Sequence, residues 1–197
     1  MYTSWNAAAE AAVKEIFAAE VRPCSVEALR SHLDGLIERF LPAGEDLTAS
    51  GSQRLRASWV QLGQLARSLG ATSDYLNFSP VFGEDHSRVF DIVVRKQRDY
   101  GHENIARFGR LGLLVRVHDK IARLENLLGA GRLPNHESIE DNVLDVIGYS
   151  IVAAMWEEGS FLLSLQPLTV VESKPRLLDE RPSIGEIVST ASLSIHL

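Results

Sequence analysis

The chain has 197 residues, 45% hydrophobic and 23% charged, which is typical of a soluble globular protein with one domain or one domain and an added subdomain. Its formal net charge of −6 argues against generic nucleic-acid binding, and its lone cysteine, Cys24, excludes a disulfide framework and a cysteine-built zinc site. No window approaches 18 uninterrupted apolar residues, and the first residues lack the pattern of a signal peptide. We therefore expect no membrane span and a cytoplasmic location.

The apolar residues recur at helical spacing, which predicts an all-α fold. We expect a helical bundle of about four core helices, with additional N-terminal helices and an extended C-terminal tail. Residues 1–84 are interpreted as an N-terminal helical support region, residues 85–165 as the core, and residues 166–197 as the tail.

Two helices are predicted in the first 40 residues. Ser4 is a suitable N-cap for an Ala-rich helix that runs to Glu20. After a break at residues 21–24, Ser25 is a suitable cap for a second helix that ends near Phe40.

A turn-rich connector at residues 41–52 precedes a third helix, predicted from about Gln53 to Leu69. Gly70 is placed just beyond its end, where a glycine commonly ends a helix. Residues 71–84 are predicted to form a loop that its aromatic side chains hold to the core.

Three further helices are predicted in the core region. The first follows Asp85, a candidate cap, and is ended by Gly101. The second covers residues 110–128. The third, at residues 138–165, is expected to be the longest, the most apolar and the centre of the bundle.

Residues 95–123 are rich in basic side chains, although the chain as a whole is acidic. The eight basic residues are Arg95, Lys96, Arg98, Arg107, Arg110, Arg116, Lys120 and Arg123. This segment predicts an anionic ligand; the alternative is a solvated helix face that acids elsewhere in the fold balance.

Carboxylates recur at one-turn spacing near the start of the last helix. Glu137, Asp141 and Asp145 follow i, i+4, i+8 and therefore lie on one side of it. Mg²⁺ between them would offset their repulsion and leave waters for a phosphate, as would a Lys or Arg from a facing helix. A simpler role for Asp141 is a capping box with Ser138.

The helix at residues 110–128 carries a matching basic stripe. Arg116, Asp119 and Arg123 share one face, and Lys120 lies beside them. The cations could bind phosphate oxygens while Asp119 helps hold a metal. Alternatively, the stripe forms internal ion pairs: Asp119 with Arg116 or Arg123, and Arg123 or Lys120 with Asp141 or Asp145.

The end of the preceding helix adds three candidate ligand-binding residues. Asp99 stands at a helix C-terminus, which does not favour an acid, so it needs a partner. Tyr100 is suited to stacking on a base, and Asn104 follows in the next turn.

Together these residues resemble the nucleotide modification associated domain, type one, a family of phages and bacteria. The pattern runs through Lys96, Asp99, Tyr100, Gly101, Asn104, Gly109, Gly112, Arg116, Asp119, Lys120, Arg123, Glu137, Asp141, Asp145 and Tyr149. The helical layout is also similar, more distantly, to all-α nucleoside triphosphate pyrophosphohydrolases of the MazG type. In those enzymes an E-x-x-E helix and an E-x-x-D helix hold Mg²⁺; here Asn142-x-x-Asp145 stands at the second position.

The sharpest functional hypothesis is a nucleotide-processing enzyme. Asp119, Asp141 and Asp145, with Glu137, would hold Mg²⁺. The phosphates would be bound by Lys96, Arg116, Lys120 and Arg123, and the base or sugar by Tyr100 and Asn104. Asp99 is a further substrate-binding candidate. The alternatives are a nucleotide-binding module without catalysis and a protein-interaction module. We also expect a homo-oligomer, since bundle sites are often completed by a second subunit.

Overall fold

The computed structural model describes residues 2–40, 49–72, 79–129 and 138–166. Within these ranges the protein contains seven α-helices and no strand, which confirms the all-α prediction. The helices are α1 (Trp5–Phe17), α2 (Val26–Phe40), α3 (Ala49–Thr72), α4 (Ser87–Tyr100), α5 (Glu103–Ala106), α6 (Gly109–Gly129) and α7 (Ile139–Glu157), with a 3-10 turn, η2, at Pro80–Phe82.

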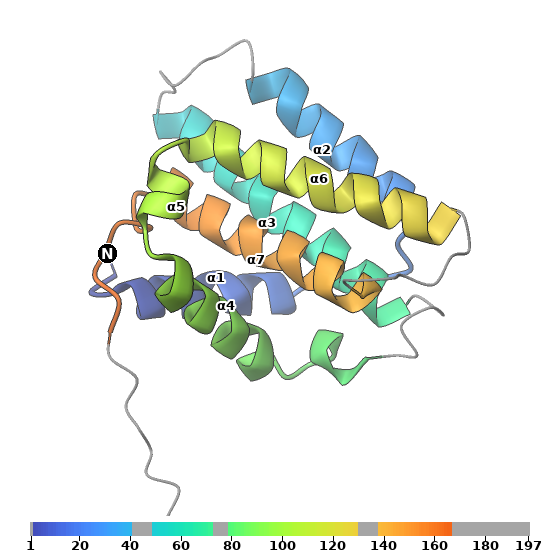
Figure 1. Ribbon diagram of the computed structural model, residues 1–197, viewed down its shortest axis with the longest axis horizontal. Helices are drawn as coiled ribbons and strands as arrows, with labels where there is room; N and C mark the ends of the chain where they lie inside the picture. Colours follow the sequence, from blue (N-terminus) through green and yellow to red (C-terminus); the bar gives the residue numbers. More distant parts are fainter. Residues whose placement is uncertain (1, 41–48, 73–78, 130–137, 167–197) are drawn as a thin grey trace, which may run out of the picture. The chain divides into compact units, whose positions relative to one another are not determined.

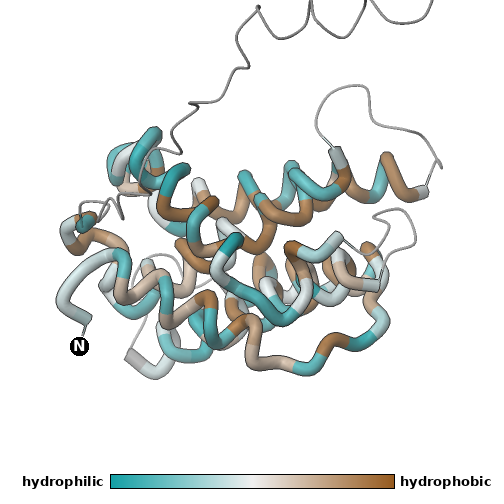
Figure 2. Tube along the Cα trace, turned by 90° about the horizontal axis from the view of Figure 1, so that it is seen from below, coloured by the Kyte–Doolittle hydropathy of each residue, from teal (hydrophilic) through white to brown (hydrophobic). Residues whose placement is uncertain are grey.

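Helix α7 is the central element, as the sequence predicts (Figure 1). It packs chiefly against α3 and α6 and also meets α1 and α4. Six consecutive residues, 150–155, are buried, so this part of α7 is enclosed on all sides. The surrounding helices alternate apolar and polar residues along their length, as amphipathic helices do (Figure 2).

The helices α1, α3 and α7 meet closely at Gly63 of α3. A Cβ atom there would lie 2.5 Å from Ile16 Cδ1 and 3.2 Å from Ser150 Cβ. This contact leaves no room for a side chain at position 63, so α1 and α7 both pack directly against α3. The N-terminal helix α1 therefore belongs to the same core as α7.

A buried arginine joins the end of α1 to the η2 turn. Arg67 of α3 is 4% exposed, and its guanidinium lies over the Phe17 ring at 4.5 Å. It donates hydrogen bonds to four main-chain carbonyls: Phe17 O (3.0 Å), Ala19 O (2.8 Å), Phe82 O (3.1 Å) and Gly83 O (3.0 Å). The burial lowers the pKa of Arg67, while the four carbonyls satisfy its donors.

Several helix boundaries differ from the sequence-based expectation. Helix α1 ends at Phe17 and not at Glu20, and α3 begins at Ala49, within the segment predicted to be a connector. Helix α3 continues past Gly70 and ends at Thr72. Gly70 lies inside the helix and packs against the Phe82 ring, since a Cβ atom there would be only 2.6 Å from that ring. Helix α7 ends at Glu157, because the chain turns at Gly159 with φ 76°. The prediction that the last helix is the longest is wrong, since α3 has 24 residues and α7 has 19.

The predicted helix ends at Ser4 and Gly101 agree with the structure, whereas the N-cap of α4 is His86 and not Asp85, whose Oδ1 accepts a hydrogen bond from Ser87 N. The Ser4 side chain accepts a hydrogen bond from Ala7 N at the start of α1. Gly101, with φ 68°, ends α4. Past α7 the chain returns to α1: Trp5 N donates to Ser164 O (3.0 Å), and Gln166 N donates to Asn6 Oδ1 (2.9 Å). Residues up to Gln166 form one compact unit, and residues 167–197 lie outside the described ranges.

Candidate ligand-binding site

The candidate site begins with the way α4 presents its side chains. Val89, Val93 and Gln97 follow i, i+4, i+8 and are buried. Lys96 and Tyr100, also one turn apart, are exposed beside this buried row. The turn at Gly101 then brings the short helix α5 close to the end of α4.

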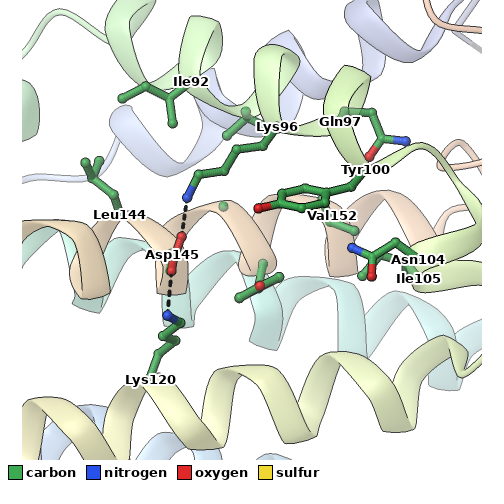
Figure 3. A pocket seen from close by; sticks show the side chains of 13 residues that line it. Ile92, Lys96, Gln97, Tyr100, Asn104, Ile105, Lys120, Leu144, Asp145 and Val152 are labelled. Carbon is green, nitrogen blue, oxygen red and sulfur yellow. Dashed lines mark hydrogen bonds and ion pairs between the residues drawn. The ribbon is translucent and has the colours of Figure 1, made fainter. Parts of the chain in front are cut away.

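A pocket of about 260 Å³ lies between α4, α5, α6 and α7 (Figure 3). Its lining is formed by Ile92, Val93, Lys96, Gln97, Tyr100, Asn104, Ile105, Lys120, Leu144, Asp145, Gly148, Tyr149 and Val152. Apolar side chains from α4, α5 and α7 form much of the wall, and the polar side chains lie at the two ends of the pocket.

One end of the pocket holds a bridge of three charges. Asp145 of α7 pairs with Lys96 of α4 through Oδ1, and with Lys120 of α6 through Oδ2 at 2.9 Å. The Asp145 and Lys120 side chains are 15% and 14% exposed, whereas that of Lys96 is 48% exposed. The charged residues of the lining therefore carry two positive charges and one negative, a net charge of +1, and one of the cations faces solvent.

The other end of the pocket is aromatic and amide-rich. In Figure 3 the Tyr100 ring lies between the Lys96–Asp145 pair and Asn104. Arg116 of α6 donates to Asn104 Oδ1 at 2.6 Å and lies 5.9 Å from the centre of the Tyr149 ring. This contact fixes α5 against α6 and α7 and positions Asn104 at the pocket.

Gly148 keeps the wall of α7 open between the two ends. A Cβ atom at this position would lie 3.8 Å from Val93 Cγ2 and would meet no other atom within 4 Å. The space in front of Gly148 is therefore part of the pocket, and only a residue without a side chain leaves it empty.

The structure brings five of the residues predicted to form the site together in the pocket. These are Lys96, Tyr100, Asn104, Lys120 and Asp145. The ion pair between Lys120 and Asp145 confirms one of the alternatives that the sequence left open.

Other residues predicted to form the site lie elsewhere. Arg116 reaches the pocket only through Asn104 and Tyr149, and the half-buried Arg123 is not part of the lining. Asp99 and Asp119 are exposed and outside the lining.

Asp141 has the simpler of its two predicted roles. It forms a capping box with Ser138, whose Oγ accepts from Asp141 N at 3.0 Å while Asp141 Oδ2 accepts from Ser138 N at 3.0 Å. The carboxylate therefore stabilises the first turn of α7, and it does not line the pocket.

The predicted Mg²⁺ site stays a prediction, but the residues at the pocket do not fit it well. Asp145 is the one acidic residue of the pocket lining within the part of the chain that the structure describes, and two ammonium groups pair with it. No group of three or more His, Cys, Asp or Glu side chains suited to a metal occurs among the described residues, and Glu137 lies outside them. We therefore derive no chemical step through a metal.

Sequence reasoning missed Gln97 and the apolar wall of the pocket. Gln97 is 7% exposed, and it occupies the place of an apolar residue in the row of Val89 and Val93. A polar residue at an apolar position of an amphipathic helix was the available signal.

Comparison with protein-family models, with curated proteins and with solved structures finds no match to this chain. The fold and the pocket thus define an all-α helical protein with a small polar and aromatic site, and the family resemblance stays a prediction. Among the described helices, none is both long enough and apolar enough to cross a lipid bilayer.

Proposed function

We propose that this protein binds a mononucleotide in the pocket between α4, α6 and α7. The observation that carries the proposal is the division of the pocket into two ends. Lysines from two helices converge on Asp145 at one end, and Tyr100 and Tyr149 supply aromatic rings toward the other. Lysine ammonium groups bind phosphate, and tyrosine rings stack on planar bases.

The size and charge of the pocket support a small ligand. Ligand sites in proteins commonly enclose about 300–1,000 Å³, and this pocket of about 260 Å³ is slightly smaller than that range. It suits one mononucleotide that is partly exposed to solvent, and not a dinucleotide. The net charge of −6 for the whole chain disfavours a long nucleic acid, while the local charge of the lining still favours one phosphate.

Binding of a phosphate at this end is an exchange of partners. Lys96 is half exposed, so it can turn its ammonium group from Asp145 toward a ligand. Lys120 keeps Asp145 Oδ2 occupied during this change, so the carboxylate is never left unpaired.

Isothermal titration calorimetry of the full chain with a panel of ribo- and deoxynucleoside monophosphates tests the proposal. Lys96→Met should weaken binding of the best nucleotide by about 10- to 150-fold, because a hydrogen bond to a charged group contributes about 1.5–3 kcal/mol. Lys14→Met is the matched control, since Lys14 is an exposed lysine of α1 that pairs with Glu10. Equal effects of the two substitutions, or no nucleotide binding by the unaltered protein, would refute the proposed site.

The same titration tests the hydrolysis that the family resemblance implies. It is run with di- and triphosphates, in EDTA and in Mg²⁺, and the products are separated by chromatography. Release of pyrophosphate or phosphate only with Mg²⁺ would support a nucleotide-processing enzyme. Equal binding in both solutions without product would support a binding module.

A further inference from the structure

Exposed apolar side chains gather on the outer face of α6, near the start of the helix. Among the described residues, five large hydrophobic side chains are more than half exposed, and three of them lie here: Phe108, Leu111 and Val115. Leu111 and Val115 are one turn apart on the same face of the helix. Phe108 packs over Gly112, where a Cβ atom would lie 2.8 Å from Phe108 Cβ. We call Phe108, Leu111 and Val115 the α6 patch.

The α6 patch is separate from both the core and the pocket. Helix α6 packs against α7, α2 and α5, and its buried residues include Leu113, Val117 and Ile121. The three side chains of the α6 patch do not belong to the pocket lining. Single exposed apolar residues are common on protein surfaces, whereas neighbouring ones mark an interaction site. The α6 patch is therefore explained neither by packing among the described residues nor by the proposed ligand.

The charges on the two sides of the α6 patch are opposite. Arg107, in the turn before α6, and Asp119, one turn past Val115, are both exposed. A surface that binds a second copy of itself about a two-fold axis must be complementary to itself. An antiparallel pairing of two α6 helices meets this condition, because it brings the basic end of each patch to the acidic end of the other. A parallel pairing would set like charges together.

A single axis satisfies the apolar and the charged positions together. When the two-fold axis passes at the level of residue 113, residues at equal distances before and after 113 lie at the same level in the two copies. Leu111 and Val115 are each two positions from residue 113, so Leu111 packs beside the partner's Val115. Arg107 and Asp119 are each six positions from it, so the opposite charges share one level. Antiparallel helices also bring the opposite ends of their dipoles together.

We propose that the α6 patch is the interface of an antiparallel dimer of this chain. The inference does not depend on nucleotide binding, and it names a surface for the homo-oligomer that the sequence predicts. A standard stable interface has about 20–30 residues on each side, far more than the α6 patch and its two flanking charges provide. The dimer is therefore weak, and its population rises with protein concentration.

Sedimentation velocity of the full chain over a range of concentrations tests the proposal. The unaltered protein should change from monomer to dimer as the concentration rises, and no larger species should form, because a two-fold interface is closed. Leu111→Glu and Val115→Glu should each weaken the dimer by at least about 100-fold. The reason is that each change occurs twice in a two-fold dimer, and each lost apolar contact of this size costs about tenfold.

Two controls separate dimer contacts from a general disturbance. Leu162→Glu is the matched variant, since Leu162 is 64% exposed, close to the 62% of Phe108, but follows α7 and lies outside the α6 patch. It should leave association unchanged, and an effect equal to that of Leu111→Glu would overturn the assignment. At concentrations where the protein is monomeric, Leu111→Glu should keep its helical circular dichroism and its melting temperature, because Leu111 is exposed in the single chain. A lower melting temperature there would show that Leu111 packs within its own chain, contrary to the proposal.

An exchange of charges tests the antiparallel register. Arg107→Glu and Asp119→Lys should each weaken the dimer by about 2- to 30-fold, because an exposed ion pair contributes little and is lost twice. The double variant restores the pair with its signs exchanged and should recover the affinity; a double variant weaker than both single ones would refute the register. A chain that stays monomeric at every soluble concentration would refute the dimer and leave a different protein as the occupant of the α6 patch.

Discussion

A methyl group added at Gly148 should separate stability from ligand binding. Gly148 lies inside α7 and faces the pocket, and the new Cβ would lie 3.8 Å from Val93 Cγ2, an ordinary van der Waals distance. Gly148→Ala therefore adds no clash to the folded protein. The methyl group projects into the space that a ligand would fill.

The two effects can be estimated. Glycine is less favourable than alanine in a helix by about 0.5–1 kcal/mol, so the variant should gain this amount. For a chain of this length, the melting temperature should rise by about 1–4 °C. The methyl group takes about the space of one water, ~30 Å³, from a pocket of about 260 Å³. Overfilling a packed contact costs about 1–3 kcal/mol, which corresponds to about 5- to 150-fold weaker nucleotide binding.

Thermal unfolding and calorimetry on the same preparation check both effects. Gly35→Ala of α2 is the control, because its new Cβ meets only the flexible end of Arg39 at 3.3 Å and Gly35 is not part of the pocket lining. It should stabilise the protein and leave the affinity unchanged. A Gly148→Ala variant that binds nucleotide as tightly as the unaltered protein would refute the pocket as the ligand site. A variant that melts lower would refute the packing described for α4 and α7.

Two further predictions concern stability. Arg67→Met should lower the free energy of unfolding by at least about 3 kcal/mol in urea, because four carbonyls lose their donor, and Arg67→Lys should lose less; a loss below about 1 kcal/mol for Arg67→Met would contradict this role. His32, whose Nε2 lies 2.8 Å from Ser58 O, has a pKa that burial lowers from its usual 6.5. The unfolded chain thus binds the proton more tightly, so the contribution of His32 to stability is full above about pH 6.5 and is lost as the pH falls below it, by at most about 1.4 kcal/mol per pH unit. His32→Gln should reduce the fall in stability between about pH 7.5 and about pH 5.5, and an unchanged pH dependence would exclude this origin.

The local signals of the sequence were sufficient for most of the fold. Ser4 and Gly101 act as predicted, because a cap and a positive φ depend on one residue and its neighbours. The end of α3 was not predictable in this way. Gly70 would suit a helix end, but the ring of Phe82 packs against it and the helix continues. Tertiary contact here overrides a local preference.

The candidate site was predictable in part for the same reason. Helical spacing placed Asp145 and Lys120 on particular faces, and their pairing needs only that α6 and α7 are neighbours. The partnership of Lys96 with Asp145 depends on how α4 crosses α7, which spacing along one helix does not contain. Gln97 was missed because its burial and its unpaired nitrogen exist only after the helices have packed.

The bridge at Asp145 has a consequence for which anions can enter. The carboxylate is tethered beside both lysines, so it competes with any ligand at a high effective concentration. A small anion such as chloride or inorganic phosphate makes no contact elsewhere in the pocket, so it binds the lysines more weakly than the tethered carboxylate does. A ligand that also reaches the aromatic end gains the additional energy needed to draw Lys96 away from the carboxylate, which stays paired with Lys120. Under the proposed function, binding of a phosphate to Lys96 therefore depends on the other contacts of the molecule that carries the phosphate.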